Sequence, residues 1–153
     1  MPGSVGGGWD VVRMTTSAPI TDAGPAAPAG SPEDLGHRFG VAVHTGDVDA
    51  IVELYAADAV VTLPHGREAA GHAAIRAAFE AALASGADLR VASVGRAVTS
   101  GPLACTTTVD TSGRVHTQVA RREPDGTWRW IRDVSRLQER AGERADQGSS
   151  PLG

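Results

Sequence analysis

The chain has histidine, glutamine and aspartate side chains at three places that could transfer a proton or hydrogen-bond a substrate carbonyl. His65 directly follows Pro64, and His116 and Gln118 stand two residues apart. A neutral imidazole can accept or donate a proton near neutral pH, because its unperturbed pKa is about 6.5. Asp133 could act as a general acid or base if it faces the interior. The candidate catalytic residues are therefore His65, His116, Gln118 and Asp133.

Each of these residues also has a structural interpretation that involves no chemistry. A histidine in a loop, as expected for His65, is commonly exposed to solvent. His116 and Gln118 share one face of a strand, but alternation alone does not say whether that face lines a pocket. An aspartate beside an arginine, as in Arg132-Asp133, is commonly a solvated or paired charge. Both interpretations stay open from the residues alone.

Several other kinds of chemistry lack their usual patterns. The five histidines show no spacing typical of metal ligands, no glycine-rich phosphate loop follows a predicted strand, and no nucleophile-elbow serine motif occurs. We therefore expect no metal and no cofactor. A net charge of −4 with scattered arginines predicts no nucleic-acid partner, and the absence of about 20 consecutive apolar residues predicts no membrane span.

The cellular location and the single cysteine follow from composition. The amino terminus has neither the basic start nor the apolar run of a signal peptide, which predicts a cytoplasmic protein. Cys105 cannot form an internal disulfide, and its place in a predicted strand suggests a small core residue.

Only the middle of the chain has the periodic apolar residues of a folded domain. Residues 1–30 and 138–153 are rich in small and polar residues, which predicts a disordered leader and a disordered tail. Residues 31–137 are expected to form one domain. We hypothesise that the native protein starts at Met14 rather than Met1, and the intact mass of the native protein would test this.

Three helices precede the long strands in the predicted order of elements. Ser31 and Pro32 begin a helix that runs to about Thr45, and Asp47 caps a second one. The apolar residues of the second helix follow helical spacing and include Val48, Ile51, Leu54 and Tyr55. A strand over 59–63 and a hairpin lead to the third helix, which Gly86 ends.

Alternating patterns then predict four strands, over residues 89–98, 103–109, 115–122 and 128–135. Their short connections favour antiparallel neighbours. Alternation places His116 and Gln118 on one face of their strand, and it places Trp130 and Asp133 on opposite faces of the last. The predicted fold class is α+β, with three helices packed on a curved antiparallel sheet. Apolar residues on both sheet faces favour a homodimer.

One segment, Gly46 to Leu83, has a distinctive order of helix, strand, hairpin and helix. It reads GDVDAIVELYAADAVVTLPHGREAAGHAAIRAAFEAAL, and it resembles the SnoaL-like, ketosteroid isomerase-like superfamily, also called nuclear transport factor 2-like. The resemblance implies a cystatin-like α+β barrel whose sheet curves around helices to form a conical pocket. In ketosteroid isomerase, an aspartate before the proline is the general base, and a tyrosine and a protonated aspartate form the oxyanion hole.

Counted from Gly46, those three positions correspond to Leu63, Phe39 and a residue near Gln118. Neither leucine nor phenylalanine can transfer a proton or donate a hydrogen bond. The resemblance therefore implies that the pocket is kept and made more apolar. The candidate substrate-binding residues are Phe39, Tyr55, Leu63, Phe79 and Trp130.

These expectations favour an enzyme of secondary metabolism that needs no cofactor. We expect a cyclase, isomerase or dehydratase that acts on a hydrophobic carbonyl-bearing molecule, such as a polyketide-like intermediate of antibiotic biosynthesis. The alternatives are a non-catalytic module for small-molecule binding or dimerisation, and an epoxide-opening hydrolase or cyclase that uses Asp133.

Overall fold

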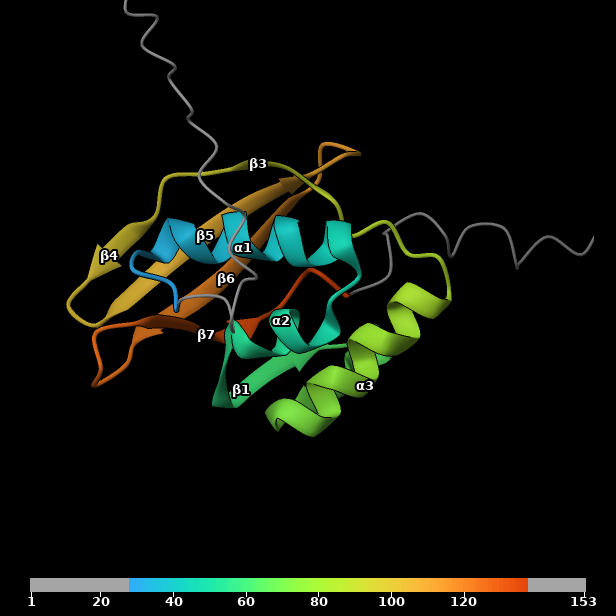
Figure 1. Ribbon diagram of the computed structural model, residues 1–153, viewed down its shortest axis with the longest axis horizontal. Helices are drawn as coiled ribbons and strands as arrows, with labels where there is room; N and C mark the ends of the chain where they lie inside the picture. The colour runs from blue at the N-terminus through green and yellow to red at the C-terminus, as the bar shows by residue number, and fades with distance from the viewer. Residues whose placement is uncertain (1–27, 138–153) are drawn as a thin grey trace, which may run out of the picture.

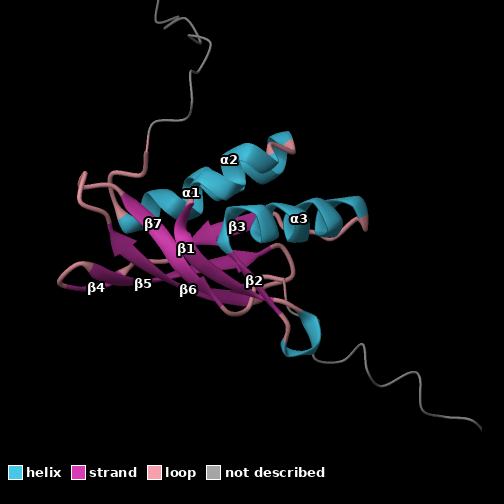
Figure 2. Cartoon of the chain, turned by 90° about the horizontal axis from the view of Figure 1, so that it is seen from below, coloured by secondary structure: helices cyan, strands magenta, loops and turns pink. Residues whose placement is uncertain are grey.

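A computed structural model describes residues 28–137, which form three helices packed on one face of a curved sheet (Figures 1 and 2). The helices are α1 (Pro32–Thr45), α2 (Val48–Glu53) and α3 (Gly71–Ala84), and η1 (Pro64–Gly66) is a single 3₁₀ turn. The strands are β1 (Tyr55–Thr62), β2 (Glu68–Ala70), β3 (Val91–Val94), β4 (Val98–Ser100), β5 (Leu103–Asp110), β6 (Val115–Arg122) and β7 (Trp128–Asp133). The disordered leader expected over residues 1–30 and the tail expected over 138–153 fall outside the described residues except at 28–30, where Ala29 is buried.

The first two helices begin where their capping residues predict. Ser31 Oγ accepts a hydrogen bond from the backbone N–H of Asp34 at 3.2 Å, and Pro32 stands in the first turn. Gly46 ends α1 in the left-handed conformation at φ 70°, which glycine adopts without steric cost. Asp47 Oδ1 then accepts from Ala50 N at 3.0 Å and starts α2. Just before α1, the buried Ala29 accepts a backbone hydrogen bond from Trp128 at 3.0 Å.

The prediction that Tyr55 lies on the second helix is wrong, because α2 ends at Glu53 and Tyr55 is the first residue of β1. The strand predicted over 59–63 is therefore longer than expected. Tyr55 pairs with Trp130 of β7, and this long-range pairing outweighs the local helical spacing.

The sheet is mixed rather than antiparallel, which corrects the predicted topology. Its order is β2-β1-β7-β6-β5-β3, with β4 paired to β5 outside that path. β1 and β7 are parallel, whereas the other neighbours are antiparallel. The last strand therefore inserts between the first strand and the meander. The segment predicted as one strand over 89–98 is split into β3 and β4, with Gly95 close against β5.

The two faces of the sheet differ in burial. The helices cover the inner face (Figure 2), where Thr106, Thr108, His116 and Gln118 are each at most 5% exposed. Cys105 is exposed on the outer face, so the expectation of a core cysteine is wrong. On β5, alternation directs Ala104 and Thr106 inward and the residue between them outward.

A register shift changes the face that Asp133 occupies. Val119 pairs with Arg132 while Ala120 pairs with Trp130, so Ile131 is an additional residue in β7. Asp133 therefore returns to the inner face, on which Trp130 also lies, and both are fully buried. Simple alternation predicts that they face opposite ways, and this bulge is the reason that the prediction is wrong.

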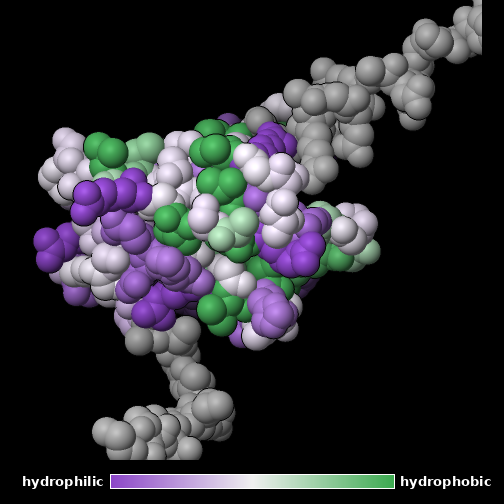
Figure 3. Space-filling model, turned by 90° about the horizontal axis from the view of Figure 1, so that it is seen from above, coloured by the Kyte–Doolittle hydropathy of each residue, from purple (hydrophilic) through white to green (hydrophobic). Residues whose placement is uncertain are grey.

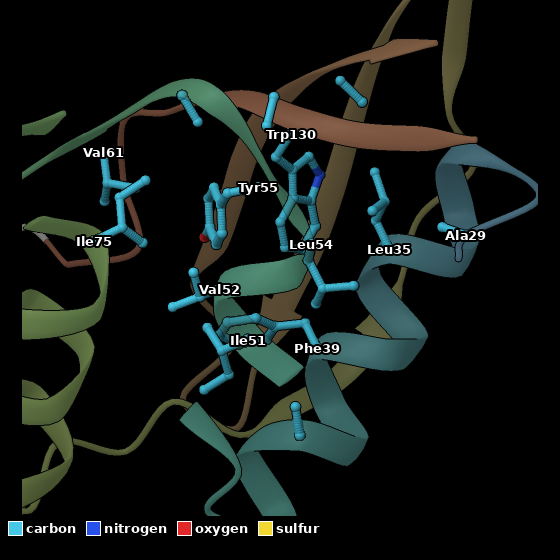
Figure 4. Close-up of a cluster of buried hydrophobic side chains, with 14 of the residues drawn as sticks. Ala29, Leu35, Phe39, Ile51, Val52, Leu54, Tyr55, Val61, Ile75 and Trp130 are labelled. Carbon is cyan, nitrogen blue, oxygen red and sulfur yellow. The ribbon is translucent and has the colours of Figure 1, made fainter. Parts of the chain in front are cut away.

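Aromatic rings fill the space between the helices and the middle of the sheet (Figure 4). Phe39, Tyr55, Phe79 and Trp130 are fully buried, and their ring centroids lie 5.3 to 5.9 Å apart in four contacting pairs. Leu35, Ile51 and other aliphatic side chains pack around them. In the part of the chain that the structure describes, no helix is long and apolar enough to cross a membrane.

Candidate functional site

A cavity of about 520 Å³ lies between the loop after α3, the start of β3 and the hairpin that joins β5 to β6. Its wall consists of Ser85, Gly86, Ala87, Asp88, Leu89, Arg90, Val91, Thr108, Asp110, Arg114, His116 and Arg136. A second, more open depression lies beside the β6–β7 turn. Its most buried charge, Glu123, already pairs with Arg121, which also pairs with Asp58.

His116 and Asp110 form a hydrogen-bonded pair in the wall of the first cavity. His116 Nε2 lies 3.0 Å from Asp110 Oδ2, and their side chains are 6% and 11% exposed. The other carboxylate oxygen accepts hydrogen bonds from Ser112 N, Ser112 Oγ and Arg114 N at 2.6 to 3.0 Å. The turn after β5 therefore fixes the carboxylate, and the carboxylate fixes the imidazole.

The environment of Asp110 keeps its carboxyl group ionised. Burial by itself would raise the pKa of this group, but the hydrogen bonds from Ser112, His116 and the backbone of Arg114 together hold the pKa well below its usual value. An ionised carboxylate only accepts hydrogen bonds, so Nε2 of His116 carries the proton. In the neutral imidazole Nδ1 keeps its lone pair, and this buried atom has no hydrogen-bond partner among the described residues. It is the ring nitrogen of His116 that can accept a proton.

Arg136 closes the inner end of the cavity. Its Nε donates to Asp133 Oδ2 at 3.2 Å, and its Nη2 donates to Thr108 Oγ1 at 3.1 Å. The guanidinium carbon lies 3.8 Å from the centroid of the Phe39 ring, a cation–π contact. With its side chain only 2% exposed, this arginine presents a charge to the cavity from a buried position.

Asp133 lies behind Arg136 and is enclosed in the core. Its Oδ2 also accepts a hydrogen bond from the hydroxyl of Tyr55 at 2.9 Å, and its Oδ1 accepts one from the backbone N–H of Arg136. Burial and then the charge of Asp133 raise the pKa of Tyr55 well above its usual value, so the phenol keeps its proton. Through these contacts Asp133 holds Arg136 in position, but Asp133 itself does not line the cavity.

Gln118 lies deeper on the inner face, next to Trp130. Thr106 Oγ1 accepts from Trp130 Nε1 at 2.9 Å and donates to Gln118 Oε1 at 3.2 Å. Gln118 Nε2 is buried without a hydrogen-bond partner in the described part of the chain. The residue shares its face with His116, as predicted, but it is not among the residues that line the cavity.

The other residues singled out from the sequence lie away from the cavity. His65 is exposed in η1, at the tip of the β1–β2 hairpin, with a left-handed backbone at φ 61°. Leu63 is half-buried just before it. Phe39, Tyr55, Phe79 and Trp130 come together, but as an aromatic core rather than as cavity wall, and Figure 4 shows Phe39, Tyr55 and Trp130 of this core. Of the four candidate catalytic residues, His116 alone lines the cavity.

Sequence reasoning missed three residues that shape the site, namely Asp110, Thr108 and Arg136. Alternation along β5 could have found the first two, because residues 106, 108 and 110 share a face that pairs with the face of His116. Arg136 follows the last predicted strand, where no local pattern indicates burial. Among the described residues, no group of three or more metal-binding side chains comes together.

Comparison with known proteins identifies a family and a fold. The family of SnoaL-like domains matches residues 37–145. A ketosteroid isomerase-like protein from Erwinia carotovora atroseptica is 19% identical, with a TM-score of 0.51 over 67% of this chain and 89% of that one. A protein of unknown function with a cystatin-like fold from Nostoc punctiforme is 19% identical, with a TM-score of 0.54 over 71% and 88%.

A third similar structure is a domain of unknown function, also with a cystatin-like fold and also from Nostoc punctiforme. It is 15% identical, with a TM-score of 0.57 over 73% of this chain and 77% of that one. No curated protein matches the chain. At these identities the structures establish the fold, and the chemistry has to be argued from the cavity.

Proposed function

The chain belongs to the family of SnoaL-like domains, and from this premise we propose that it is a cofactor-independent isomerase, cyclase or dehydratase acting on a carbonyl-bearing small molecule. The observation that carries the proposal is the His116–Asp110 pair in the wall of the cavity. A base that a buried carboxylate orients is an arrangement suited to general acid–base catalysis.

The first chemical step is proton abstraction next to the substrate carbonyl. Nδ1 of His116 takes the proton, and the electrons of the broken C–H bond move into the carbonyl to form an enolate. The resulting imidazolium lies against the ionised Asp110, which offsets its charge. In a substrate with a double bond next to the acidic carbon, return of the same proton to the far carbon of the dienolate completes an isomerisation. Attack of the enolate carbon on a second carbonyl gives a cyclisation instead, and the imidazolium then protonates the new alkoxide.

Arg136 is the group best placed to stabilise the enolate oxygen. Asp133 and Thr108 fix its orientation before any substrate arrives, so little reorganisation is needed during the reaction. In this proposal Arg136 takes the role of oxyanion donor, for which Phe39 lacks the chemistry, and His116 takes the role of base, for which Leu63 lacks it. Gln118 is too deep for this role, since it lies outside the cavity wall.

The cavity also limits the substrate. Its volume of about 520 Å³ lies within the usual range for small-molecule sites. Leu89 and Val91 supply an apolar part of the wall, while charged and hydroxyl groups make up much of the rest. This mixture suits an oxygenated carbonyl compound, such as a polyketide-like intermediate of secondary metabolism, better than a wholly apolar one.

Asp133 gives little support to the alternative of epoxide opening. A carboxylate that attacks an epoxide, or a carboxylic acid that protonates one, has to reach the substrate. Asp133 is fully buried, and Tyr55 and Arg136 occupy its oxygens.

Deuterium exchange tests the acid–base proposal. Aromatic ketones are incubated with the protein in D₂O, and proton NMR follows the loss of the signal of the hydrogens next to the carbonyl. We expect the wild type to accelerate this exchange and His116→Gln to lower the acceleration about a hundredfold or more. Asp110→Asn is expected to act in the same direction, because it removes the group that sets the tautomer.

The exposed His44 of α1 provides the matched control, and His44→Gln is expected to exchange as fast as the wild type. If His116→Gln, folded by circular dichroism, also keeps the full rate, the assignment of the base is wrong. If the wild type binds ketones but never accelerates exchange, the chain is a binding module instead.

A further inference from the structure

Three arginines lie in the wall of the cavity that holds His116, and they differ in how far their charges are already paired. Arg90 makes two hydrogen bonds to Asp88, from Nε at 2.9 Å and Nη2 at 2.8 Å. Arg136 is paired with Asp133. Within the described residues, the side chain of Arg114 has no hydrogen bond or ion pair. One positive charge in the wall is therefore uncompensated.

The acidic groups of the same wall are already engaged. Asp88 accepts hydrogen bonds from the backbone and guanidinium of Arg90 and from the hydroxyl of Thr111. Asp110 accepts from Ser112, His116 and the backbone of Arg114. The hydrogen-bonding capacity that the cavity still offers a ligand lies mainly on donors, at Arg114 and on the N–H groups of Arg136 that Asp133 and Thr108 leave unused.

These donors lie at two different ends of the cavity. Arg114 is half-buried at the hairpin between β5 and β6, whereas Arg136 is buried at the inner end beside Thr108. His116 pairs with Thr108 in the register of β5 and β6, which places the imidazole close to the inner end. A ligand that satisfies both ends needs an acceptor for Arg136 and a second acceptor, with negative charge, for Arg114.

We propose that the substrate of this site carries a carboxylate, which Arg114 binds while the substrate carbonyl lies at Arg136 and His116. The placement of the carbonyl rests on the proposed function, whereas binding of the carboxylate does not. A guanidinium matches a carboxylate in charge and in the geometry of paired N–H donors. A monoanionic carboxylate also matches the single unpaired arginine, while a dianionic phosphate would face Asp88 and Asp110 with only one free cation to balance it.

Calorimetric titration with two matched probes tests this proposal. The probes are 4-oxo-4-phenylbutanoate and 4-oxo-4-phenylbutanamide, which differ only in whether the far end of the molecule is a carboxylate or a neutral amide. We expect the wild type to bind the carboxylate at least about tenfold more tightly, because hydrogen bonds to charged groups contribute more than neutral ones. Added salt is expected to reduce this preference.

Arg114→Gln is the decisive variant and Arg67→Gln is its matched control. Both remove one positive charge, but Arg67 is exposed at the β1–β2 hairpin and does not line the cavity. Arg114→Gln is expected to abolish the preference for the carboxylate, and Arg67→Gln is expected to retain it. The proposal is overturned if both probes bind equally or not at all, if Arg114→Gln keeps the preference, or if phenyl phosphate binds more tightly than the carboxylate.

The same probes separate this proposal from the acid–base function. His116→Gln is expected to keep the preference for the carboxylate while it loses deuterium exchange. A wild type that prefers the carboxylate but catalyses no exchange would support the binding site and contradict the proposed function. Exchange without any preference for the carboxylate would support the proposed function and contradict the binding site.

Discussion

The hydroxyl of Tyr55 donates a hydrogen bond to Oδ2 of Asp133 at 2.9 Å, and this contact joins two parallel strands whose residues are 78 apart in sequence. Both side chains are fully buried. The same oxygen accepts from Nε of Arg136, so one carboxylate connects the aromatic core to the inner end of the cavity. The stability of the core and the orientation of Arg136 therefore depend on the same atoms.

Tyr55→Phe is expected to destabilise the protein by about 1–3 kcal/mol, because it removes a donor from a buried charged acceptor. The ring itself stays, so its contacts with Phe79 and Trp130 are kept. Urea denaturation measures the change. The exposed hydroxyl of Thr99 on β4 gives the control, and Thr99→Val is expected to change stability far less. Equal stabilities for Tyr55→Phe and the wild type would contradict a structural role for this hydrogen bond.

A double-mutant cycle at Asp133 and Arg136 is expected to show strong coupling. Asp133→Asn leaves a buried guanidinium without its counter-ion, and Arg136→Met leaves a buried carboxylate, so each single change should cost about 3–5 kcal/mol. The double variant removes both charges and is expected to be more stable than the sum of the two losses predicts. Strictly additive losses in urea denaturation would show that the ion pair contributes nothing specific.

The position of Asp133 also shows where local sequence patterns stop being sufficient. The helix starts at Ser31 and Asp47 could be predicted, because a cap and its N–H donor lie within four residues of each other. The face of the sheet on which Asp133 lies could not be predicted, since it depends on Ile131, the one additional residue in β7. A bulge has no reliable local signature, and a shift of one residue reverses every face beyond it.

The candidate site also contains residues that the sequence could predict and residues that it could not. His116 could be found from its residue type and from alternation on β6. Arg136 could not, because its burial depends on Asp133, Thr108 and Phe39, which come from three separate elements. The parallel pairing of β1 with β7 could not be predicted either, since no local pattern specifies which distant strand becomes a neighbour.

Two glycines of α1 offer a matched pair of stability predictions. A Cβ added at Gly36 would lie 3.0 Å from Thr108 Cγ2 and from both methyl groups of Val94, whereas one at Gly40 would lie 3.5 Å from Val91 Cβ. Replacing a mid-helix glycine with alanine should stabilise the helix by about 1 kcal/mol in each case. At Gly36, overpacking of about 1–3 kcal/mol opposes that gain.

Gly40→Ala is therefore expected to raise the melting temperature, and Gly36→Ala to leave it unchanged or lower it. Thermal unfolding followed by circular dichroism measures both. A larger gain at Gly36 than at Gly40 would mean that α1 and the sheet are less tightly packed than their distances indicate.

The outer face of the sheet is expected to mediate a homodimer. Val98, Cys105 and Val119 form a row across β4, β5 and β6, and Val98 is 73% exposed. Leu103 and Val115 are 43% and 57% exposed. The helices lie on the opposite face, so no element of the described chain covers this row (Figure 2). The face drawn in Figure 3 instead shows apolar side chains in small groups among polar ones.

Val98→Glu is expected to shift the protein from dimer to monomer, because it places a charge in the apolar contact. Light scattering after size-exclusion chromatography measures the mass. Val41→Glu is the control, since Val41 is similarly exposed at 65% but lies on α1. A wild type that is monomeric at every concentration would contradict the expectation, as would a dimer that only Val41→Glu disrupts.

The low pKa of Asp110 makes a prediction about acid stability. Burial alone would raise this pKa, but the hydrogen bonds from Ser112 and His116 and from the backbone of Arg114 place it below the unfolded value of about 3.9. A group with a depressed folded pKa stabilises the protein above the unfolded pKa, and this contribution is lost as the pH falls toward the folded pKa.

Asp110→Asn, which cannot ionise, should therefore cost more stability at about pH 5 than at about pH 3. Urea denaturation of this variant and the wild type at the two pH values measures the difference. Ser112→Ala is expected to show the same trend more weakly, because it removes only the hydroxyl donor and leaves the backbone donors in place. If Asp110→Asn costs the same at both pH values, the hydrogen bonds of the turn do not hold the carboxylate in its ionised form, and the orientation of His116 would need another cause.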